Sequence, residues 1–382
     1  MLKKLFTILL IIFPILYMYQ TPILTLTVSD VLLITIIPFL LIDMARRKIK
    51  ISIYKPLGII VLYIIMQTLI IILLSNDSST NPIIFSILRL LLYYSVLMLF
   101  GRTYFDIDLG IKFYRKVAIF VCCFLFLQII FEQFFNFYIP GTIPGLPISE
   151  AMTEYNAQKT AGNSARLRSL FAEPAHFATY VSLIFAIDLL NENKINKRIL
   201  IYTLGLLLSG SSTGIFMVAI IYTVYFFKNI KSFSKRTLIN ISVIIALIAI
   251  ILPLYIQTDP FEIFYERTFL NENSSIDGRF GNYGLVLKET NTANMLFGRG
   301  TFAEIDDYIP ALPRIYYYYG LIGIIYFGIR TINNFIKLKG TQFASWLVLV
   351  ILIFPTEFIF GYLIMVYMPF IMNGVEEKVL KN

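Results

Sequence analysis

The chain has few of the residues that build metal and redox centres. Its 382 residues include one histidine, His176, and two cysteines, Cys122 and Cys123, which are neighbours inside an apolar run. Adjacent cysteines in such a run are expected to be buried thiols and not part of a disulfide framework. With so few ligands, a metal site of Cys and His side chains is close to excluded, and neither a metal nor another cofactor is expected.

Charged residues are also scarce: they make up 14% of the chain, whereas a soluble domain carries about 25%. Hydrophobic residues reach 58%, and apolar runs such as 5–16 and 239–254 recur along the whole sequence. A soluble core could not bury that many apolar segments. The pattern therefore predicts an all-α polytopic protein of the cell membrane, with residues 1–382 forming one integral membrane domain.

The net charge of +9 does not indicate nucleic-acid binding, because the basic residues form short clusters between apolar runs, as in the loops of membrane proteins. A Gly-rich phosphate loop is missing from the sequence, which argues against an ATP-driven pump or an enzyme that uses nucleotide sugars. The N-terminal run resembles a signal peptide, but no small-residue cleavage site follows it. We therefore interpret it as a retained first helix.

A membrane-spanning helix needs about 20 apolar residues, and the sequence predicts about twelve such helices. They are expected at 5–19, 24–43, 56–75, 82–100, 117–138, 174–190, in two parts of 199–227, at 238–256 and 315–330, and in two parts of 343–373. The run 199–227 is divided at Ser209–Gly214, because this returns the basic residues that follow it to the cytoplasmic side. The run 343–373 is too long for one helix and is divided at Pro355–Glu357. Both termini are then cytoplasmic, and two large loops, 139–168 and 257–314, lie outside.

Basic residues in these outer loops run against the general charge bias. They are Lys159, Arg166, Arg168, Arg267, Arg279, Lys288, Arg299 and Arg314. Positive charge on the outer face suits a bound anion, and the planar guanidinium group suits pyrophosphate best. The alternative is a set of solvated charges that pair with nearby carboxylates, and this alternative fits Arg267 and Lys288 best.

Two ionisable residues, Asp30 and Arg89, fall inside predicted membrane helices. Charges buried in a membrane usually pair with each other or line a polar cavity. We expect a pair or a shared network, which is either purely structural or brings Arg89 to the substrate.

The stretch Arg166–Tyr180 carries polar side chains at the spacing of one helix face. Pro174 disfavours helix at Glu173, so the helix is expected to begin at Pro174, with His176 and Tyr180 aligned on it. Glu173 then lies at the helix entrance, where a carboxylate either complements the helix N-terminus or serves as a catalytic base. His176 is either a hydrogen-bonded structural residue or a base.

The second outer loop ends in another cluster of unusual residues. Gly298 and Gly300, on either side of Arg299, permit tight backbone turns. Arg314 stands just before four tyrosines, Tyr316–Tyr319, which open the next predicted helix. These tyrosines suit the aromatic belt of a membrane interface, and stacking on sugar rings is the alternative.

The combination of these motifs resembles the Wzy-type polysaccharide polymerases and the related O-antigen ligases. The matching parts are Arg166-x-x-Ser-x-Phe-x-Glu-Pro174, the break at Ser209–Gly214, and Arg279 followed by Gly298-x-Gly300. Their order and the two outer loops match over most of the chain, and because each motif is short, the specificity rests on the combination. Ligases tend to have a His-Asn pair before the helix that follows the second loop, where this chain has Pro313-Arg314. That difference favours a polymerase.

The resemblance implies a glycosyltransferase of the polyprenyl-phosphate-sugar (GT-C-like) type, inverting and metal-independent. It would transfer a growing glycan from undecaprenyl pyrophosphate onto a lipid-linked repeat unit outside the membrane, in the biosynthesis of an O-antigen, capsule or exopolysaccharide. The implied partners are the undecaprenyl-pyrophosphate-linked oligosaccharide, membrane lipid, and a flippase and chain-length regulator of the same pathway.

Site residues follow from the resemblance and from the patterns above. Arg166 and Arg279 are implied as the pyrophosphate contacts, and Glu173 and then His176 are the candidate bases. The further candidate substrate contacts are Arg168, Arg299, Arg314, Arg89 and Tyr180.

Other classes of function stay open at this point. A flippase for lipid-linked oligosaccharides would carry charged residues along a central cavity, whereas in this chain they gather at the outer face. A ligase would be recognised by its product, a polymer on a different acceptor. A small-solute transporter would have no task for two large outer loops.

Overall fold

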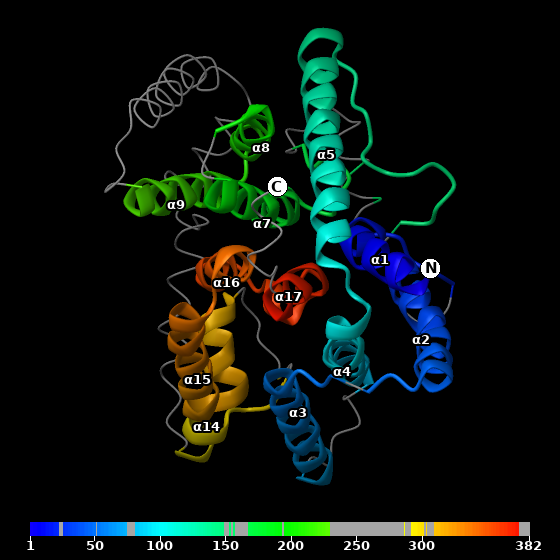
Figure 1. The fold of residues 1–382 in the computed structure, drawn as a ribbon, viewed down its shortest axis with the longest axis vertical. Coiled ribbons are helices and arrows are strands. Elements are labelled where there is room, and N and C mark those ends of the chain that lie inside the picture. The colour runs from blue at the N-terminus through cyan, green and yellow to red at the C-terminus, as the bar shows by residue number, and fades with distance from the viewer. Residues whose placement is uncertain are drawn as a thin grey trace. The chain divides into compact units, whose positions relative to one another are not determined.

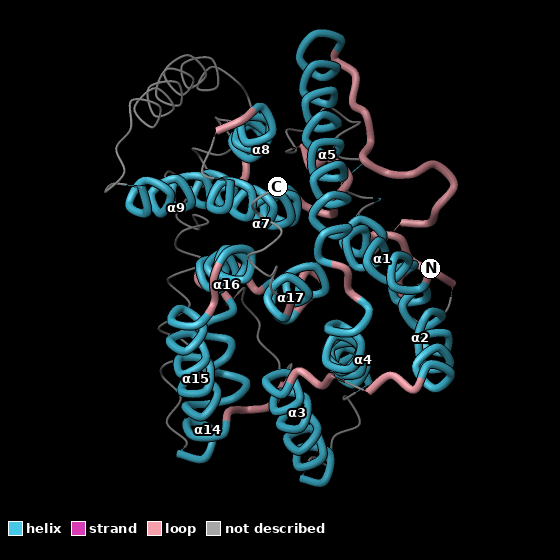
Figure 2. Tube along the Cα trace, viewed as in Figure 1, coloured by secondary structure: helices cyan, strands magenta, loops and turns pink. Residues whose placement is uncertain are grey.

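The computed structural model describes residues 1–22, 26–50, 52–74, 81–148, 153, 156, 167–192, 195–229, 286, 292–301, 303 and 309–373. These residues form an all-α protein: in Figure 2 they are drawn as helix or loop. The helices in chain order (Figure 1) are α1 (Leu2–Leu16), α2 (Val28–Arg47), α3 (Lys55–Leu74), α4 (Asn81–Tyr104), α5 (Ile107–Phe135), α7 (Pro174–Glu192), α8 (Lys197–Leu208), α9 (Ser212–Asn229), α14 (Thr292–Phe297), α15 (Ala311–Lys337), α16 (Gly340–Ile353), the 3₁₀ helix η4 (Phe358–Phe360) and α17 (Ile364–Met372).

Three of the described helices are long and apolar enough to cross a membrane: Val28–Arg47, Ile84–Tyr104 and Ile107–Phe135. Their outward surfaces are apolar as well, since large hydrophobic side chains such as Phe39 on α2 and Phe120 on α5 are exposed. An apolar outer surface is what a helix needs in contact with lipid tails. These features indicate a membrane protein.

The chain forms two compact units. One comprises Met1–Phe13, Leu32–Gly110 and Ser275–Asn382. In this unit α3 packs against α4, α4 against α17, and α15 against both α14 and α16. The other comprises Pro14–Val31 and Ile111–Ser274, in which α7 packs against α8 and α9.

Side-chain caps fix where several helices begin. At the start of α2, Asp30 accepts a hydrogen bond from the Thr27 backbone N–H, and the Thr27 hydroxyl accepts one from the Asp30 N–H, which is a capping box. Asp106 caps α5 through the Leu109 N–H. Asn196 caps α8 by accepting from two backbone N–H groups. Each cap satisfies helix donors that have no partner within the helix.

The two helix breaks predicted from the sequence are confirmed. The run 199–227 is divided into α8 and α9, with Gly210 at φ 61° between them. Gly214 allows the start of α9 to approach α8, because a Cβ there would lie 2.6 Å from the Leu206 carbonyl oxygen. The run 343–373 is likewise divided, between the end of α16 at Ile353 and the start of α17 at Ile364.

Other boundaries differ from the expected ones. The segment 101–116 was expected to lie between two helices, but α4 continues to Tyr104 and α5 begins at Ile107, because the Asp106 cap starts a new helix there. The expectation that both cysteines are buried is wrong for Cys123, which is exposed, while Cys122 is buried and both are free. Neighbouring residues of a helix point about 100° apart, and the side of α5 that buries Cys122 leaves Cys123 facing outward.

Candidate functional site

The loop Leu167–Glu173 leads directly into α7, which begins at Pro174 as the sequence predicted. Ser169 holds the loop in place although its φ of 54° is unusual for a residue with a side chain. Its backbone N–H donates to Gln128 Oε1 at 2.9 Å, and its hydroxyl donates to the Val121 carbonyl at 2.7 Å. Both acceptors belong to α5, so the loop is attached to that helix.

A second loop segment, from Ile139 to Ile148, meets the first at Gly141. A Cβ at Gly141 would lie 1.7 Å from the Ser169 carbonyl oxygen, so only glycine permits this approach. The buried amide of Gln128 joins the two segments, since its Nε2 donates to the Ile139 carbonyl at 2.8 Å while its oxygen accepts from Ser169. Sequence reasoning missed Gln128, a polar residue on an apolar helix.

Arg168 is fully buried within this loop structure. Its guanidinium group donates to the carbonyls of Phe171 and Ala172 and, at 2.6 Å, to Asn156 Oδ1. Tyr138 donates to the same amide oxygen. Burial raises the pKa of the Tyr138 phenol, and the neighbouring Arg168 charge opposes that shift. Arg168 therefore fixes the shape of the loop before α7, and its side chain does not face solvent.

The first turns of α7 present the candidate bases. Glu173 is exposed, and its backbone carbonyl accepts from the N–H groups of His176 and Phe177, so this residue caps the helix with its main chain. His176 is half-buried in the first turn. Tyr180 is fully buried, and its ring packs on Phe171 with a centroid distance of 5.0 Å. Tyr180 is thus a core residue of the helix entrance.

In the other unit, α15 is broken at Gly320. This residue has φ 63° inside the helix, and a Cβ there would lie 2.4 Å from the Leu296 carbonyl oxygen. Gly298 also has positive φ, at 79°, and a Cβ there would lie 2.1 Å from the Tyr318 carbonyl oxygen. The segment from α14 to Gly300 therefore packs its backbone directly against the break, whereas the sequence had predicted only tight backbone turns at Gly298 and Gly300.

The break frees backbone carbonyls, and neighbouring groups satisfy them. The carbonyl of Tyr317 accepts from the Arg299 N–H at 2.8 Å. The carbonyl of Tyr318 accepts from Gln67 Nε2 at 2.6 Å, and Tyr63 donates to the next carbonyl along the chain. Irregular backbone at membrane depth is tolerated where it is covered by protein in this way, and broken helices of this kind form substrate sites in many membrane proteins.

Two of the predicted arginines lie at this break. Arg299 is exposed, with its guanidinium carbon 5.2 Å from the centre of the Tyr317 ring. Arg314 forms an ion pair of 2.5 Å with Glu357, which follows the end of α16. Its Nε is buried and has no hydrogen-bond partner among the described residues, so Arg314 retains one donor. The Gly320 break and the α16–α17 break therefore meet through a charge pair.

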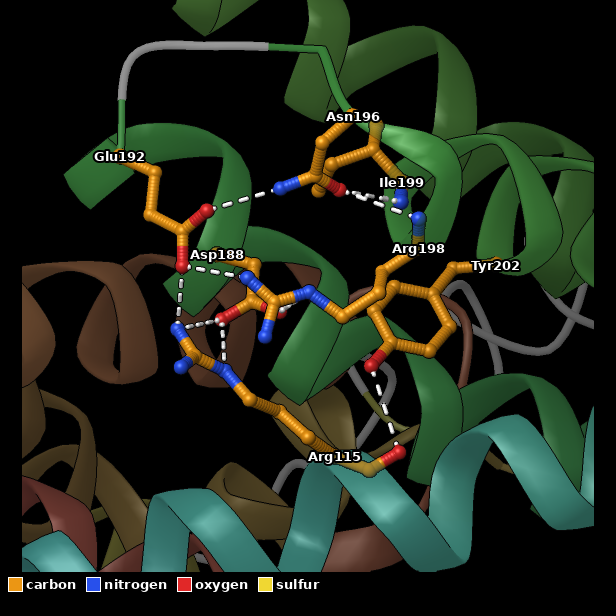
Figure 3. A network of polar contacts seen from close by, with 7 residues as sticks. All are labelled: Arg115, Asp188, Glu192, Asn196, Arg198, Ile199 and Tyr202. Atoms are coloured by element: carbon orange, nitrogen blue, oxygen red, sulfur yellow. Dashed lines mark hydrogen bonds and ion pairs between the residues drawn. The ribbon is translucent and has the colours of Figure 1, made fainter.

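A polar network lies near the far end of α7, and the sequence analysis did not identify it. Figure 3 shows side chains of α5, α7 and α8 pointing toward one another. Arg115 donates to Asp188 Oδ1 at 2.6 Å and to Glu192 at 2.6 Å, and Arg198 donates to Glu192 at 2.7 Å. Asp188 is fully buried.

The network balances two arginines against two carboxylates, which a buried charge requires. Asp188 lies fifteen residues beyond Glu173 on α7, about 22 Å along the helix axis, so the network fastens the helices and does not belong to the entrance. The four-residue spacing of Asp188 and Glu192 on one helix face was the available signal.

The other residues singled out in the sequence are Arg166, Arg279, Arg89 and Asp30. Arg166 and Arg279 lie outside the described residues, so their convergence stays a prediction. Arg89 is half-buried within α4. Asp30 belongs to the capping box of α2, a role the sequence analysis did not consider. Its pairing with Arg89 also stays a prediction, because the two residues belong to different units.

Comparison with protein-family models, with curated proteins and with solved structures found no significant match to this chain.

Proposed function

We propose that the chain is a membrane glycosyltransferase that polymerises a cell-surface polysaccharide on the outer face of the membrane. Its donor is the growing glycan on undecaprenyl pyrophosphate, and its acceptor is a lipid-linked repeat unit. The enzyme spans the membrane about twelve times, with both termini in the cytoplasm. The proposal combines the resemblance to Wzy-type polymerases with the structure of the entrance to α7.

The observation that carries the proposal is the construction of that entrance. In the motif Arg166-x-x-Ser-x-Phe-x-Glu-Pro174, the serine and the phenylalanine are buried and hold the loop, while Glu173 is exposed at the first turn of a helix. The spacing of the motif thus has a physical reason. It leaves one carboxylate facing outward on a rigid support, which a general base requires.

The reaction needs no nucleotide, because the bond between the anomeric carbon and pyrophosphate is already activated. The acceptor hydroxyl attacks the anomeric carbon while the bond to the pyrophosphate oxygen breaks, and the hydroxyl proton passes to the Glu173 carboxylate. Arg166 and Arg279 stabilise the charge that develops on the leaving undecaprenyl pyrophosphate. Arg168 acts as a positioning residue, since its buried guanidinium holds the loop that leads to Glu173.

The length of the glycan chains tests the proposed roles of Arg166 and Arg279. Arg166→Ala and Arg279→Ala should each leave single, unpolymerised repeats on lipid at the outer face, with the protein still present in the membrane fraction. Arg267→Ala is the matched control, because this outer-loop arginine has no place in the proposal and should leave chain length normal. Lipid-linked glycans are extracted and separated by size.

Normal chain lengths from both arginine variants would remove this proposal. Repeats confined to the inner leaflet of cells that lack the protein would instead identify a flippase, since a polymerase acts after the repeat has crossed the membrane.

A further inference from the structure

The unit that contains α15 holds an apolar cavity of about 200 Å³ that the proposed reaction does not use. Helices α3, α15, α16 and α17 contribute most of its lining. One face of α15 lines the cavity with the side chains of Ile315, Tyr319, Ile322, Tyr326, Arg330 and Asn334. Beyond the break at Gly320, the positions from Ile322 to Asn334 extend about 18 Å along the helix.

One end of this apolar cavity is polar. Asn334 and Trp346 both line it and are 6% and 7% exposed, yet Asn334 Nδ2 and Trp346 Nε1 have no hydrogen-bond acceptor in the part of the chain that the structure describes. The other amide atom of Asn334, its Oδ1, accepts from Arg330 Nη2 at 3.4 Å. Leaving a buried donor unpaired is destabilising, so two such groups in one cavity indicate that a ligand supplies the acceptors.

The donors belong to neighbouring helices, Arg330 and Asn334 to α15 and Trp346 to α16. Because α15 ends at Lys337 and α16 begins at Gly340, the two helices are sequential neighbours that pack together. The Trp346 ring lies 6.2 Å from the ring of Phe327, one turn before Arg330. Trp346 therefore faces α15 at the level where the Arg330 guanidinium enters the cavity.

Positive charge surrounds this end. The Arg330 guanidinium lies 3.5 Å from the Tyr54 hydroxyl, and Arg102 stacks over the same tyrosine ring, 4.8 Å from its centre. Lys337 and Lys339 are exposed at the adjoining helix ends. None of the described residues that line the cavity is Asp or Glu. The polar end therefore suits an anion that accepts hydrogen bonds and donates none.

We infer that this cavity binds one chain of an anionic glycerophospholipid. The lipid phosphate accepts hydrogen bonds from Arg330, Asn334 Nδ2 and Trp346 Nε1, and part of an acyl chain fills the apolar space. A cavity of about 150 Å³ holds a benzene-sized group, so this one accommodates a segment of a single chain. The site lies near the opposite end of α15 from Arg314, and the inference does not depend on polymerase activity.

Trp346 is the single tryptophan of the chain, which makes the site directly measurable. The full-length protein is reconstituted in phosphatidylcholine vesicles that contain either brominated phosphatidylglycerol or brominated phosphatidylcholine, and quenching of Trp346 fluorescence is followed against mole fraction. Brominated phosphatidylglycerol should quench at about tenfold lower mole fraction, the difference expected from one or two charge-assisted contacts. Equal quenching by the two lipids would overturn the inference.

Three variants and one soluble probe complete the test. Arg330→Gln should abolish the preference for phosphatidylglycerol, and Arg47→Gln, which removes an exposed arginine paired with Asp43 in the same unit, should keep it. Asn334→Leu should weaken the preference while the protein stays folded; a more stable protein with the full preference would identify Asn334 as an unused buried amide and contradict the site. Glycerol phosphate in solution should not compete, because it has no chain, and competition would replace the lipid with a free phosphate.

Discussion

At the scale of single residues, two side chains of the loop before α7 have opposite environments. Arg168 is buried and donates to the carbonyls of its own loop, whereas Glu173, five positions later, is exposed. Spacing placed both at the helix entrance but could not say which faces outward, because Gln128 and Gly141, on other segments, decide the course of the loop. Of the two, only Glu173 is exposed, as the proposed general base must be.

We expect Glu173→Gln to lower the polymerisation rate about 10²–10⁴-fold, the usual contribution of a general base, while thermal unfolding changes little. The rate is measured on purified protein with lipid-linked repeats, and unfolding is followed in the same detergent. Glu173→Asp keeps a negative charge at the helix N-terminus and should recover part of the rate. A normal rate in Glu173→Gln with a small loss of stability would make Glu173 a capping residue, whose charge only complements the helix N-terminus.

At the scale of helices, the sequence was most informative about breaks that carry polar residues. The divisions at Ser209–Gly214 and Pro355–Glu357 were predicted from charge parity and from the length of the run, respectively, and are confirmed. The break at Gly320 was not predicted, because a single glycine inside an apolar run is tolerated in an ordinary helix. Its positive φ is decided by the backbone of Leu296–Gly298, which packs against it from elsewhere in the sequence.

Gly320→Ala tests this explanation, with Gly328→Ala as its control on the same helix. Alanine at position 320 would meet a backbone conformation, φ 63° and ψ −160°, that is essentially restricted to glycine and costs about 1–3 kcal/mol. It would also meet a carbonyl 2.4 Å away, for which overpacking costs about 1–3 kcal/mol. Alanine at 328 meets nothing within 4 Å and should be neutral or slightly stabilising. Denaturant unfolding in detergent compares the two. Equal stabilities would mean that α15 continues unbroken in solution.

At the scale of the whole molecule, composition was sufficient to predict the all-α membrane class. A chain with only 14% charged residues is expected in lipid, where only helices or a closed barrel satisfy the backbone hydrogen bonds. The apolar runs of this chain have the length of helices. Although the four-residue spacing of Asp188 and Glu192 was a signal, the sequence could not show that Asp188 pairs with Arg115. Both residues lie in apolar helices, and only the packing of α5 against the end of α7 brings them together. The same limit applies to every site assembled from distant segments.

The orientation of the chain is the last feature that can be tested independently of catalysis. If most of the Lys and Arg residues mark the cytoplasmic side, then Leu146, in the loop after α5, lies outside and Lys339, between α15 and α16, lies inside. Both side chains are exposed. In a chain whose two cysteines are replaced by alanine, Leu146→Cys should react with a membrane-impermeant maleimide in intact cells, and Lys339→Cys should react only after permeabilisation. Labelling of Lys339→Cys in intact cells would show that the orientation is the reverse of the predicted one. The guanidinium groups of the two large loops would then face the cytoplasm, where an enzyme of the proposed kind does not extend an undecaprenyl-linked polymer.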